Sequence, residues 1–403
     1  MPDKFDVIAV EDRFSPPFFK KIPVVVERGE GVWVWDEHGR RYLDFTAGWG
    51  VTCLGHASPV ISRALLEQGS KIIQNPSSGL TYSPARARLL SLLSTILPAT
   101  LTRVFFASSG AEANDAVIKL ARKVTGRLNI IASQKGFHGR TISTASATGQ
   151  AKHRERFNPL MPNYVFVPYN DITALEQAMS SEIAAVLLEP IQGEGGVNLP
   201  DPGYLQQVSK LCVAHGACLI IDEVQTGFCR TGSMFAIDGL NLAVDFMTMA
   251  KGIAGGFPFA AFATSERVAA RLEPGDHGGT YSGNPLGCAV AHAVISHLKD
   301  KAIHLNVINV GEALLTRLSA MQARHSDIIT VVRGKGLLIA VEFATPALAA
   351  AVFTGALDRG LFLNLIQERL IRIFPALNIT LTEAEEGLDI LAEVLDSLGT
   401  LNS

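Results

Sequence analysis

The sequence is poor in cysteine, and its cysteines are not paired. Five occur among 403 residues, and no two of them form a CxxC motif. Closely spaced pairs would be typical of a disulfide framework or a zinc site. The pattern therefore predicts reduced thiols in a cytosolic protein, and we expect no bound metal. The cysteines are Cys53, Cys212, Cys218, Cys229 and Cys288.

Long apolar runs and basic runs are also missing. No uncharged apolar run approaches the roughly 20 residues that cross a bilayer, and the first residues lack the basic-then-apolar pattern of a signal peptide. The formal net charge of −3 argues against binding to nucleic acid. We therefore predict neither a membrane protein nor a nucleic-acid-binding protein.

The chain does contain enough apolar material for a large core. It has 403 residues, of which 48% are hydrophobic, so its length predicts two or more domains. Residues 1–50 are expected to form an extended arm and a small meander. We predict that residues 1–55 belong to this arm and to part of a small domain, 56–300 to a large domain, and 301–403 to the rest of the small domain.

Short strand patterns alternate with longer helical patterns from about residue 55, which predicts an α/β layer with a mostly parallel sheet. From about residue 300, further helices and strands predict a smaller α+β domain. The expected strands are 103–107, 128–132, 164–167, 184–188, 217–221, 244–249, 259–263, 328–332, 336–343 and 370–374. The expected helices are 58–72, 84–96, 110–124, 171–180, 202–215, 285–299, 303–323, 346–359 and 382–397.

A carboxylate and a lysine give the most informative signal. The apolar run 217–221 ends at Asp222, so a buried strand would deliver one charge at its carboxyl end. Lys251 stands before Gly252, a pattern typical of an amine held on a tight turn. An acid that keeps a pyridine nitrogen protonated and a lysine that forms an imine are what a pyridoxal phosphate enzyme requires, and Gln225 could bind a ring oxygen. A structural ion pair and a surface lysine are the alternatives.

The segment around Ser109 favours a phosphate site. Ser109, Gly110 and Ala111 lie between the strand 103–107 and the helix 110–124. Free N–H groups at a helix N-terminus bind phosphate well, although Ser109 could simply cap the helix. Thr280, in a glycine-rich segment before the helix 285–299, could supply a hydroxyl to the same phosphate.

Five other side chains could bind a ring or a charge. Phe137 could lie flat on a heteroaromatic ring, and Arg140 could present a fork to a carboxylate. Glu189 and Glu194 follow a strand and could mask a nearby cation. Arg372 is a charge inside an apolar run, so it is either paired in the protein or available to an anionic ligand. Taken singly, polar or solvated loops remain the alternatives.

Together these motifs resemble the class III, fold-type I pyridoxal phosphate aminotransferases, from about Pro23 to the C-terminus. Within that group the chain is most similar to the acetylornithine and ornithine aminotransferases. The resemblance implies a large domain with a mostly parallel seven-stranded sheet, a small α+β domain built from both termini, the cofactor pyridoxal 5′-phosphate (PLP), and a homodimer. It is carried by the phrases Glu189-Pro-Ile-Gln-Gly-Glu-Gly-Gly, Asp222-Glu-Val-Gln-Thr-Gly, His277-Gly-Gly-Thr-Tyr and Arg333-Gly-Lys-Gly-Leu.

The resemblance also implies which residues contact the cofactor. Lys251 would form the imine and carry the proton between the substrate carbon and the cofactor. Asp222 would pair with the ring nitrogen, Phe137 would stack on the ring, and Val224 and Gln225 would lie against the ring and its oxygen. The phosphate would be held by Ser109, Gly110 and Ala111, joined by Thr280 of the neighbouring subunit.

Substrate carboxylates are assigned by the same resemblance. Arg140 would take the carboxylate of the ω-amino substrate, and Arg372 the α-carboxylate of glutamate or 2-oxoglutarate. Glu194 would cover Arg372 during the half-reaction that does not use it. A movable pair of this kind would change which end of a substrate is bound.

Three pocket positions bear on the choice of substrate. Ornithine aminotransferases have a tyrosine where this chain has Trp49, whose ring cannot accept a hydrogen bond from an ammonium group. Gly279 stands where acetylornithine enzymes often have serine, and Tyr82 matches a pocket tyrosine of the family. Trp49 therefore favours an acylated or otherwise less polar head group.

We predict an aminotransferase that moves the ω-amino group of N-acetylornithine, or a similar ω-amino acid, to 2-oxoglutarate by a ping-pong mechanism. The alternatives are ornithine, 4-aminobutyrate or a diamine as donor, or a decarboxylation or aminomutase reaction on the same cofactor. A non-catalytic regulator is disfavoured because no helix-turn-helix precedes the domain. A dinucleotide-binding protein is disfavoured because no G-x-G-x-x-G motif follows the first strand of the α/β region.

Overall fold

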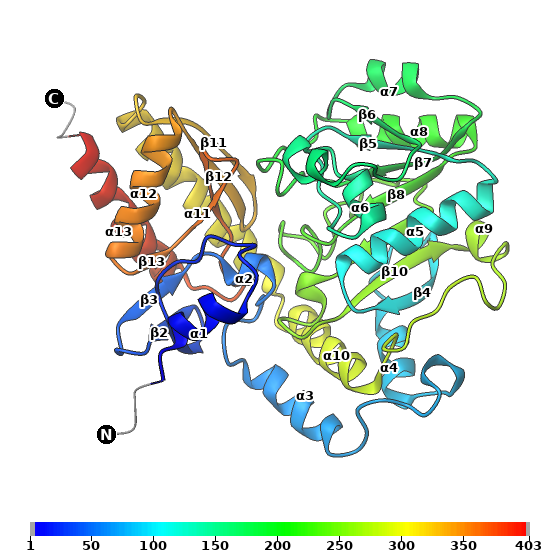
Figure 1. Cartoon of the computed structure of the whole chain (residues 1–403), viewed down its shortest axis with the longest axis horizontal. Coiled ribbons are helices and arrows are strands. Elements are labelled where there is room, and N and C mark those ends of the chain that lie inside the picture. The colour runs from blue at the N-terminus through cyan, green and yellow to red at the C-terminus, as the bar shows by residue number, and fades with distance from the viewer. Residues whose placement is uncertain (1–4, 400–403) are drawn as a thin grey trace.

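Seven strands form the largest sheet of the protein, whose computed structural model describes residues 5–399 (Figure 1). In spatial order they are β4 (Leu101–Ala107), β10 (Ala260–Ser265), β9 (Phe246–Met249), β8 (Cys218–Asp222), β7 (Ile183–Leu188), β5 (Asn129–Ser133) and β6 (Tyr164–Val167). Strand β10 is antiparallel to β4 and β9, and the other neighbours are parallel. The predicted mostly parallel seven-stranded sheet is confirmed.

The central strands are covered on both faces, which explains their near-continuous apolar sequences. Every residue of β7 and β8 is buried. Helix α5 (Gly110–Thr125) packs its apolar side onto the sheet, where Val117 joins Leu187 and Ile220 in one core cluster. The other helices between these strands are α6 (Ile142–Ala147), α7 (Ile172–Ala178) and α8 (Tyr204–His215), and α9 (Glu266–Ala269) follows β10.

Three helices pack together at the lower edge of the sheet in Figure 1, where α10 contacts both α3 and α4. Their bounds are α3 (Pro59–Gly69), α4 (Pro84–Leu93) and α10 (Pro285–Asp300). No helix in the described part of the chain is long and apolar enough to cross a membrane. Short 3₁₀ turns are Ser78–Leu80, Ala151–His153, Glu155–Phe157 and Lys251–Ile253.

Both ends of the chain build the second lobe, as predicted, and Figure 1 shows their blue and red segments side by side. One sheet has the order β1 (Val26–Glu30), β2 (Trp33–Asp36), β3 (Arg41–Asp44) and β13 (Leu361–Phe362). The other has the order β11 (Ile329–Lys335), β12 (Leu338–Phe343), β15 (Leu370–Ile373) and β14 (Asn364–Ile366). The helices are α11 (Ile303–Arg324), α12 (Pro346–Asp358) and α13 (Leu381–Gly399).

The prediction of an extended N-terminal arm is partly wrong. Residues Val7–Phe14 form helix α1, although residues 1–4 lie outside the described part. The helix begins because the Asp6 side chain accepts a hydrogen bond from the Ala9 N–H at 2.9 Å. None of its residues is buried, so it forms from this local capping and not from packing within the chain.

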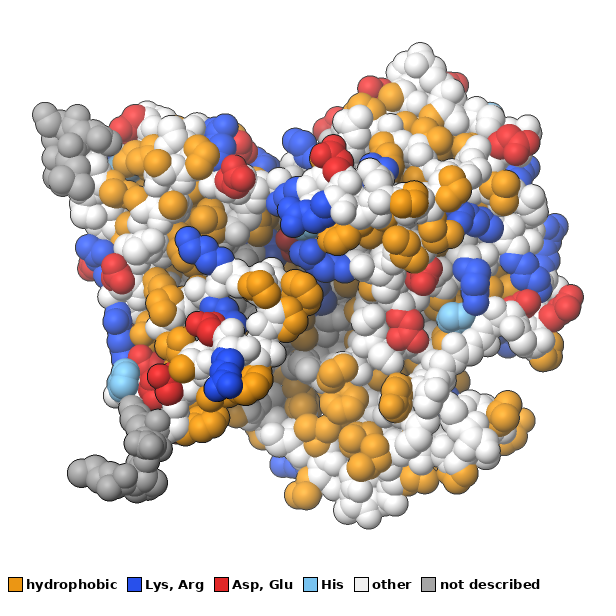
Figure 2. Space-filling view, viewed as in Figure 1, with side chains coloured by type: hydrophobic (Ala, Val, Ile, Leu, Met, Phe, Trp, Pro, Cys, Tyr) orange, Lys and Arg blue, Asp and Glu red, His pale blue; other side chains and the backbone are white. Residues whose placement is uncertain are grey.

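The two lobes enclose a hollow, which Figure 2 shows in its space-filling view with Lys and Arg side chains gathered along the upper edge. In the large lobe, the strands β4, β5, β7, β8 and β9 all run parallel to one another and end at one edge of the sheet. Ligands of open α/β sheets bind outside the carboxyl ends of the strands. This edge is therefore where a site is expected.

Candidate active site

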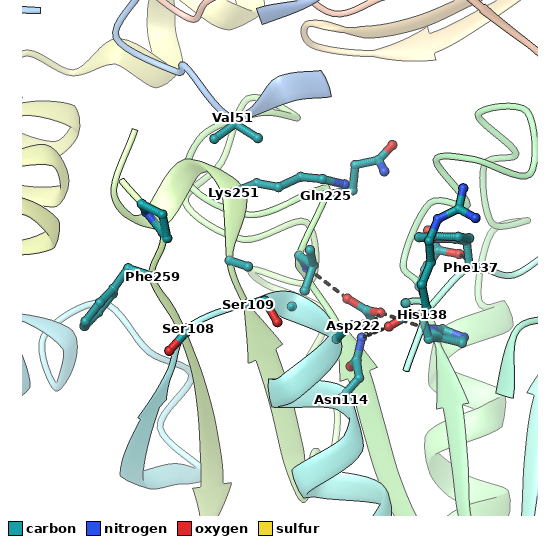
Figure 3. A pocket seen from close by; sticks show the side chains of 18 of the residues that line it. Val51, Ser108, Ser109, Asn114, Phe137, His138, Asp222, Gln225, Lys251 and Phe259 are labelled. Atoms are coloured by element: carbon teal, nitrogen blue, oxygen red, sulfur yellow. Dashed lines mark hydrogen bonds and ion pairs between the residues drawn. The ribbon is translucent and has the colours of Figure 1, made fainter. Parts of the chain in front are cut away.

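A pocket of about 470 Å³ opens at this edge of the sheet (Figure 3). Its walls come from the segments that follow β4, β5, β7, β8 and β9, together with Val51 near the N-terminus. Residues far apart in the sequence therefore meet in one cavity. Nine of the predicted site residues line it: Ser109, Gly110, Ala111, Phe137, Arg140, Asp222, Val224, Gln225 and Lys251.

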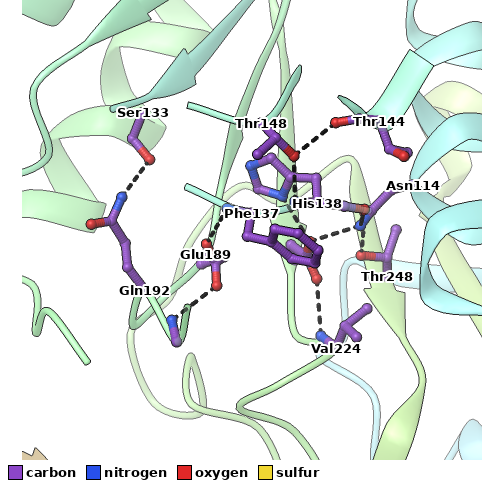
Figure 4. A network of polar contacts seen from close by, with 12 residues as sticks. Asn114, Ser133, Phe137, His138, Thr144, Thr148, Glu189, Gln192, Val224 and Thr248 are labelled. Carbon is purple, nitrogen blue, oxygen red and sulfur yellow. Dashed lines mark hydrogen bonds and ion pairs between the residues drawn. The ribbon is translucent and has the colours of Figure 1, made fainter. Parts of the chain in front are cut away.

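Asp222 is the last residue of β8 and is only 2% exposed. Its Oδ2 accepts a hydrogen bond from Asn114 Nδ2 at 2.7 Å and contacts His138 Nδ1 at 2.8 Å, while Oδ1 accepts one from the Val224 N–H at 3.0 Å. Figure 4 shows this network. These contacts compensate the burial of the carboxylate and fix its orientation in the pocket wall.

His138 and Asn114 were not predicted as site residues. Asn114 lies in the first turns of α5, and its Oδ1 accepts a hydrogen bond from Thr248 Oγ1 at 2.8 Å. His138 lies in the sequence between Phe137 and Arg140, which were both predicted as site residues. Nothing in the sequence connects either residue with Asp222, since the contacts join three separate segments.

Lys251 begins a 3₁₀ turn directly after β9 and has a positive φ of 46°, which is uncommon for a residue other than glycine. Its side chain extends across the pocket toward Gln225 (Figure 3). Burial lowers the pKa of the Lys251 amine from 10.5 to about 8, although the Glu194 carboxylate opposes the shift. The amine is therefore available as a nucleophile at mildly alkaline pH.

The start of α5 provides both of the features considered from the sequence. Ser109 Oγ accepts a hydrogen bond from the Glu112 N–H at 3.2 Å, and Glu112 Oε2 accepts one from the N–H of Ser108, the residue before the cap, at 2.8 Å, an arrangement similar to a capping box. The N–H groups of Gly110 and Ala111 still have no intrahelical acceptor. A Cβ atom on Gly110 would lie 2.9 Å from Val224 Cγ1, so only glycine fits at this position at the start of α5 without a shift of Val224.

The Phe137 loop is held by Glu189. Glu189 Oε1 accepts a hydrogen bond from the Phe137 N–H at 2.9 Å, and Oε2 accepts one from the Gly193 N–H at 3.0 Å. Burial raises the pKa of Glu189 to about 7. This acid therefore fixes backbone and does not mask a cation. Arg140 is exposed, with its guanidinium carbon 5.8 Å from the centre of the Phe137 ring.

Arg372 and Glu194 are in contact, as expected. Arg372 is 1% exposed, and its Nη1 lies 2.6 Å from Glu194 Oε1 and 2.7 Å from Gln225 Oε1. Burial would raise the pKa of Glu194, but Arg372 and Lys251 hold it below its ordinary value. The pair thus carries opposite charges, and Gln225 joins it to the pocket wall.

Besides Glu194 and Arg372, four other predicted residues do not line the pocket of the described chain: Trp49, Tyr82, Gly279 and Thr280. Trp49 and Tyr82 are exposed, and the centres of the Trp49 and Phe19 rings lie 6.0 Å apart. The Thr280 carbonyl accepts hydrogen bonds from Gln74 Nε2 and Ser78 Oγ, both at 2.6 Å. A Cβ on Gly279 would lie 2.3 Å from Ser282 Oγ, so a side chain here would require the Ser282 hydroxyl to rotate away.

The residues of the pocket fit PLP. A carboxylate held by three contacts is available to a ring nitrogen, a lysine amine has its pKa lowered to about 8, and a glycine-containing helix start is open to a phosphate. The donor set therefore suits each functional group of this cofactor, and it comes from the chain itself.

Comparisons with known proteins agree with this chemistry. A family model described as "Aminotransferase class-III" matches residues 15–395. The chain is 42% identical over 397 residues to the acetylornithine aminotransferase of Methanothermobacter thermautotrophicus, covering 98% of this chain and 100% of the relative. A crystallised ornithine aminotransferase from Toxoplasma gondii with partial PLP occupancy has a TM-score of 0.91 and 30% identity, over 96% and 93% of the two chains. An acetylornithine aminotransferase structure from Elizabethkingia anophelis has a TM-score of 0.85 and 32% identity, over 97% and 98%.

Proposed function

This chain belongs to the class III aminotransferases, which depend on PLP, and on that basis we propose that it moves the ω-amino group of N-acetylornithine, or of a similar ω-amino acid, to 2-oxoglutarate. The observation that carries the proposal is the contact of Arg372 with Glu194 at 2.6 Å next to the pocket. An enzyme that binds its two substrates by different ends needs one arginine that can be masked, here Arg372, and another that stays exposed, here Arg140.

The chain's own residues would hold the cofactor as follows. The N–H groups of Gly110 and Ala111 would bind the phosphate, and Phe137 would lie against the ring. Asp222 would pair with the ring nitrogen and keep it protonated. When bound, PLP supplies an electron-withdrawing ring that stabilises negative charge on the substrate carbon. Lys251 would provide the amine that holds the aldehyde and would then carry the proton to and from that carbon.

The lowered pKa of Lys251 gives a testable pH dependence. Because burial disfavours the charged amine, the Lys251 side chain should be mostly neutral above about pH 8. Competitive acylation of the cofactor-free protein, followed by peptide mapping, should show the reactivity of Lys251 rising with a midpoint near this value. Exposed Lys210 is the internal reference. A midpoint near the ordinary value of 10.5 would contradict the effect of burial on the amine.

Substrate orientation follows from the two arginines. Arg140, at the rim, would take the carboxylate of the ω-amino donor. If Arg372 were uncovered at that stage, it would capture the same carboxylate and present the wrong amine to the reacting carbon. Glu194 would prevent this by occupying Arg372, and would move aside when the α-carboxylate of glutamate or 2-oxoglutarate arrives.

We propose that Trp49, Tyr82 and Gly279, which lie outside the pocket of the single chain, select the head group of the donor where two copies meet. Trp49 offers an apolar ring with no acceptor for an ammonium group, which favours an acylated amine over free ornithine. The relatives named as acetylornithine aminotransferases support the same choice. Ornithine, 4-aminobutyrate and diamines are the competing donors.

A donor screen tests the proposed function. Purified enzyme loaded with PLP is mixed with 2-oxoglutarate and N-acetylornithine, N-succinylornithine, ornithine or 4-aminobutyrate, and glutamate formation is measured. We expect kcat/KM for N-acetylornithine to exceed that for ornithine by about tenfold or more, since ornithine places a charged amine against Trp49. Product formation without any 2-oxo acid would instead indicate decarboxylation or an aminomutase. A higher kcat/KM for ornithine or 4-aminobutyrate would replace the proposed substrate.

We also propose a homodimer that shares its active site. Exposed apolar side chains occur on and between α3 and α4, including Leu66, Ile73 and Leu80. Figure 2 shows hydrophobic side chains on the lower part of the larger lobe, where Figure 1 places these helices. Side chains of the same segment donate hydrogen bonds to the carbonyl of Thr280. Thr280 is the residue that the family resemblance assigns to the phosphate of the neighbouring subunit. A second copy would cover this surface and complete the pocket.

A cytosolic location is proposed from the cysteines. All five are free and buried, and burial raises the pKa of the Cys53, Cys212, Cys218, Cys229 and Cys288 thiols. Such thiols behave as small apolar core residues and suit a reducing compartment.

A further inference from the structure

Asn364 holds one edge of the buried Arg372 guanidinium. The two residues are directly opposite each other on the antiparallel strands β14 and β15. Arg372 Nε donates to Asn364 Oδ1 at 3.0 Å, and Arg372 Nη2 donates to the same oxygen at 2.7 Å. Both nitrogens are donors, so the oxygen of the amide must face them. A shift of the strand register by one residue would turn Asn364 to the other face of the sheet.

The charge around Arg372 is balanced by a single carboxylate among its hydrogen-bond partners in the described chain. Nη1 contacts Glu194 Oε1 at 2.6 Å and the neutral Gln225 Oε1 at 2.7 Å. With the neutral oxygen of Asn364 at the other edge, all three guanidinium nitrogens are satisfied. Removal of Glu194 from this set would leave every other contact in place and the positive charge of Arg372 uncompensated.

A second buried arginine adds positive charge near Arg372, and the neutral side chain of Asn364 does not balance it. The Arg230 guanidinium carbon lies 4.3 Å from the centre of the Phe374 ring, and the Arg372 guanidinium carbon lies 4.9 Å from the same centre. Arg230 Nη1 donates only to backbone carbonyls, at 3.0 Å to Leu337 and 2.6 Å to Pro375. An aspartate at position 364 would give shorter and stronger hydrogen bonds and would balance this positive charge. The neutral amide instead leaves this balance to Glu194.

We propose that Asn364 is a positioning residue that aims Arg372 with a neutral oxygen and so keeps its charge available to the α-carboxylate of the substrate. The proposal rests on the proposed function, in which Glu194 gives up Arg372 to glutamate or 2-oxoglutarate. If the carbonyl at position 364 were a carboxylate, Arg372 would remain neutralised after Glu194 moved, and an incoming carboxylate would meet no net charge. Asn364 thus makes the masking by Glu194 reversible.

The decisive variant is Asn364→Asp, which changes the charge but not the shape of the side chain. Asn364→Ala removes the oxygen without adding charge. Asn241→Asp adds the same charge at an exposed position with positive φ and is the matched control. Each protein is tested in three ways: calorimetric binding of glutarate, the single-turnover half-reaction with glutamate, and the single-turnover half-reaction with N-acetylornithine.

For Asn364→Asp we expect the dissociation constants of glutarate and glutamate to rise about tenfold to a hundredfold, which is the range for losing one hydrogen-bonded charge contact. The half-reaction with N-acetylornithine should change by less than about threefold, because Arg372 is covered at that stage. For Asn364→Ala we expect the same selectivity with a smaller loss, about threefold to tenfold. Asn241→Asp should match the wild type in all three measurements.

Equal losses with glutamate and N-acetylornithine would show that Asn364 only supports the fold, and would overturn the proposal. Unchanged glutarate binding in Asn364→Asp would overturn it as well. If that variant does not fold, the selectivity of Asn364→Ala decides. If the wild type does not use N-acetylornithine, the proposed substrate fails, but the comparison with glutamate and glutarate still tests Asn364, because neither measurement involves the donor. A wild type that binds neither glutarate nor glutamate would remove the role of Arg372 and with it the proposal.

Discussion

Replacement of Lys251 by alanine should lower the rate of transamination by at least about 10⁴-fold. The substitution removes both the buried amine, whose pKa is about 8, and the group that would carry the proton at the substrate carbon. The rate is measured as glutamate formation from 2-oxoglutarate with PLP in excess, so that weaker cofactor binding does not by itself explain the loss. Lys210→Ala, at an exposed position, is the control and should keep the wild-type rate.

A chemical experiment identifies the same lysine independently of turnover. Borohydride treatment of the PLP-loaded wild type should fix the cofactor mass on the peptide that contains Lys251, and no such peptide should appear in Lys251→Ala. If the variant transaminates at the wild-type rate, or if the label is found on another lysine, the assignment of Lys251 is wrong.

Replacement of Asp222 by asparagine should cost about a thousandfold or more in kcat. The side chain would keep its shape, but a neutral amide could not hold a ring nitrogen in its protonated form. It would also place an NH₂ group against the donor of either Asn114 Nδ2 or Val224 N, each of which now points at one oxygen of the carboxylate. We therefore expect a loss of PLP affinity as well, measured as the dissociation constant of the cofactor by fluorescence.

Asp245 provides a matched control for Asp222. It is also a buried acid next to the large sheet, where it accepts a hydrogen bond from the Leu219 N–H at 3.0 Å and pairs with Arg267 at 2.6 Å, but it does not line the pocket. Asp245→Asn should lower the melting temperature while leaving turnover per PLP-loaded site within about twofold, since it touches no reacting group. Similar kinetic losses in both variants would mean that Asp222 acts only through stability.

The sequence predicted the large sheet well because its strands carry strong local signals. Strand β6 was placed at the bounds that the structure has, and β4, β5, β7, β8, β9 and β10 within about two residues. Buried parallel strands are continuous apolar runs, and such runs are visible without any tertiary information. The long helices were found for a related reason, since their apolar faces repeat with the helical period.

The missed elements lack such signals. Helix α6, Ile142-Ser-Thr-Ala-Ser-Ala, is short and rich in residues that do not favour helices, and strand β14 has only three residues. The N-terminal arm was expected to be extended because nothing in residues 5–25 shows a buried pattern. Its helix α1 begins with a cap made by one side chain, that of Asp6.

The site residues also differ in whether a local sequence signal marked them. Lys251, Asp222 and Ser109 were found because each follows a strand, and parallel strands end at a common edge. Arg372 was noticed because a charge inside an apolar run needs a partner. Its partners Gln225 and Asn364 were not foreseen in that role, and neither were His138 and Asn114 beside Asp222.

By itself, then, the sequence determined which chemical groups are present and that they stand at the ends of buried strands, because those properties are local. Only the tertiary structure decided which group contacts which. Hydrogen bonds and ion pairs depend on ångström distances between segments far apart in the sequence, such as Glu194 and Arg372, which are separated by 178 positions. No pattern along the chain encodes such a distance, since it is set by the packing of the two lobes around the pocket.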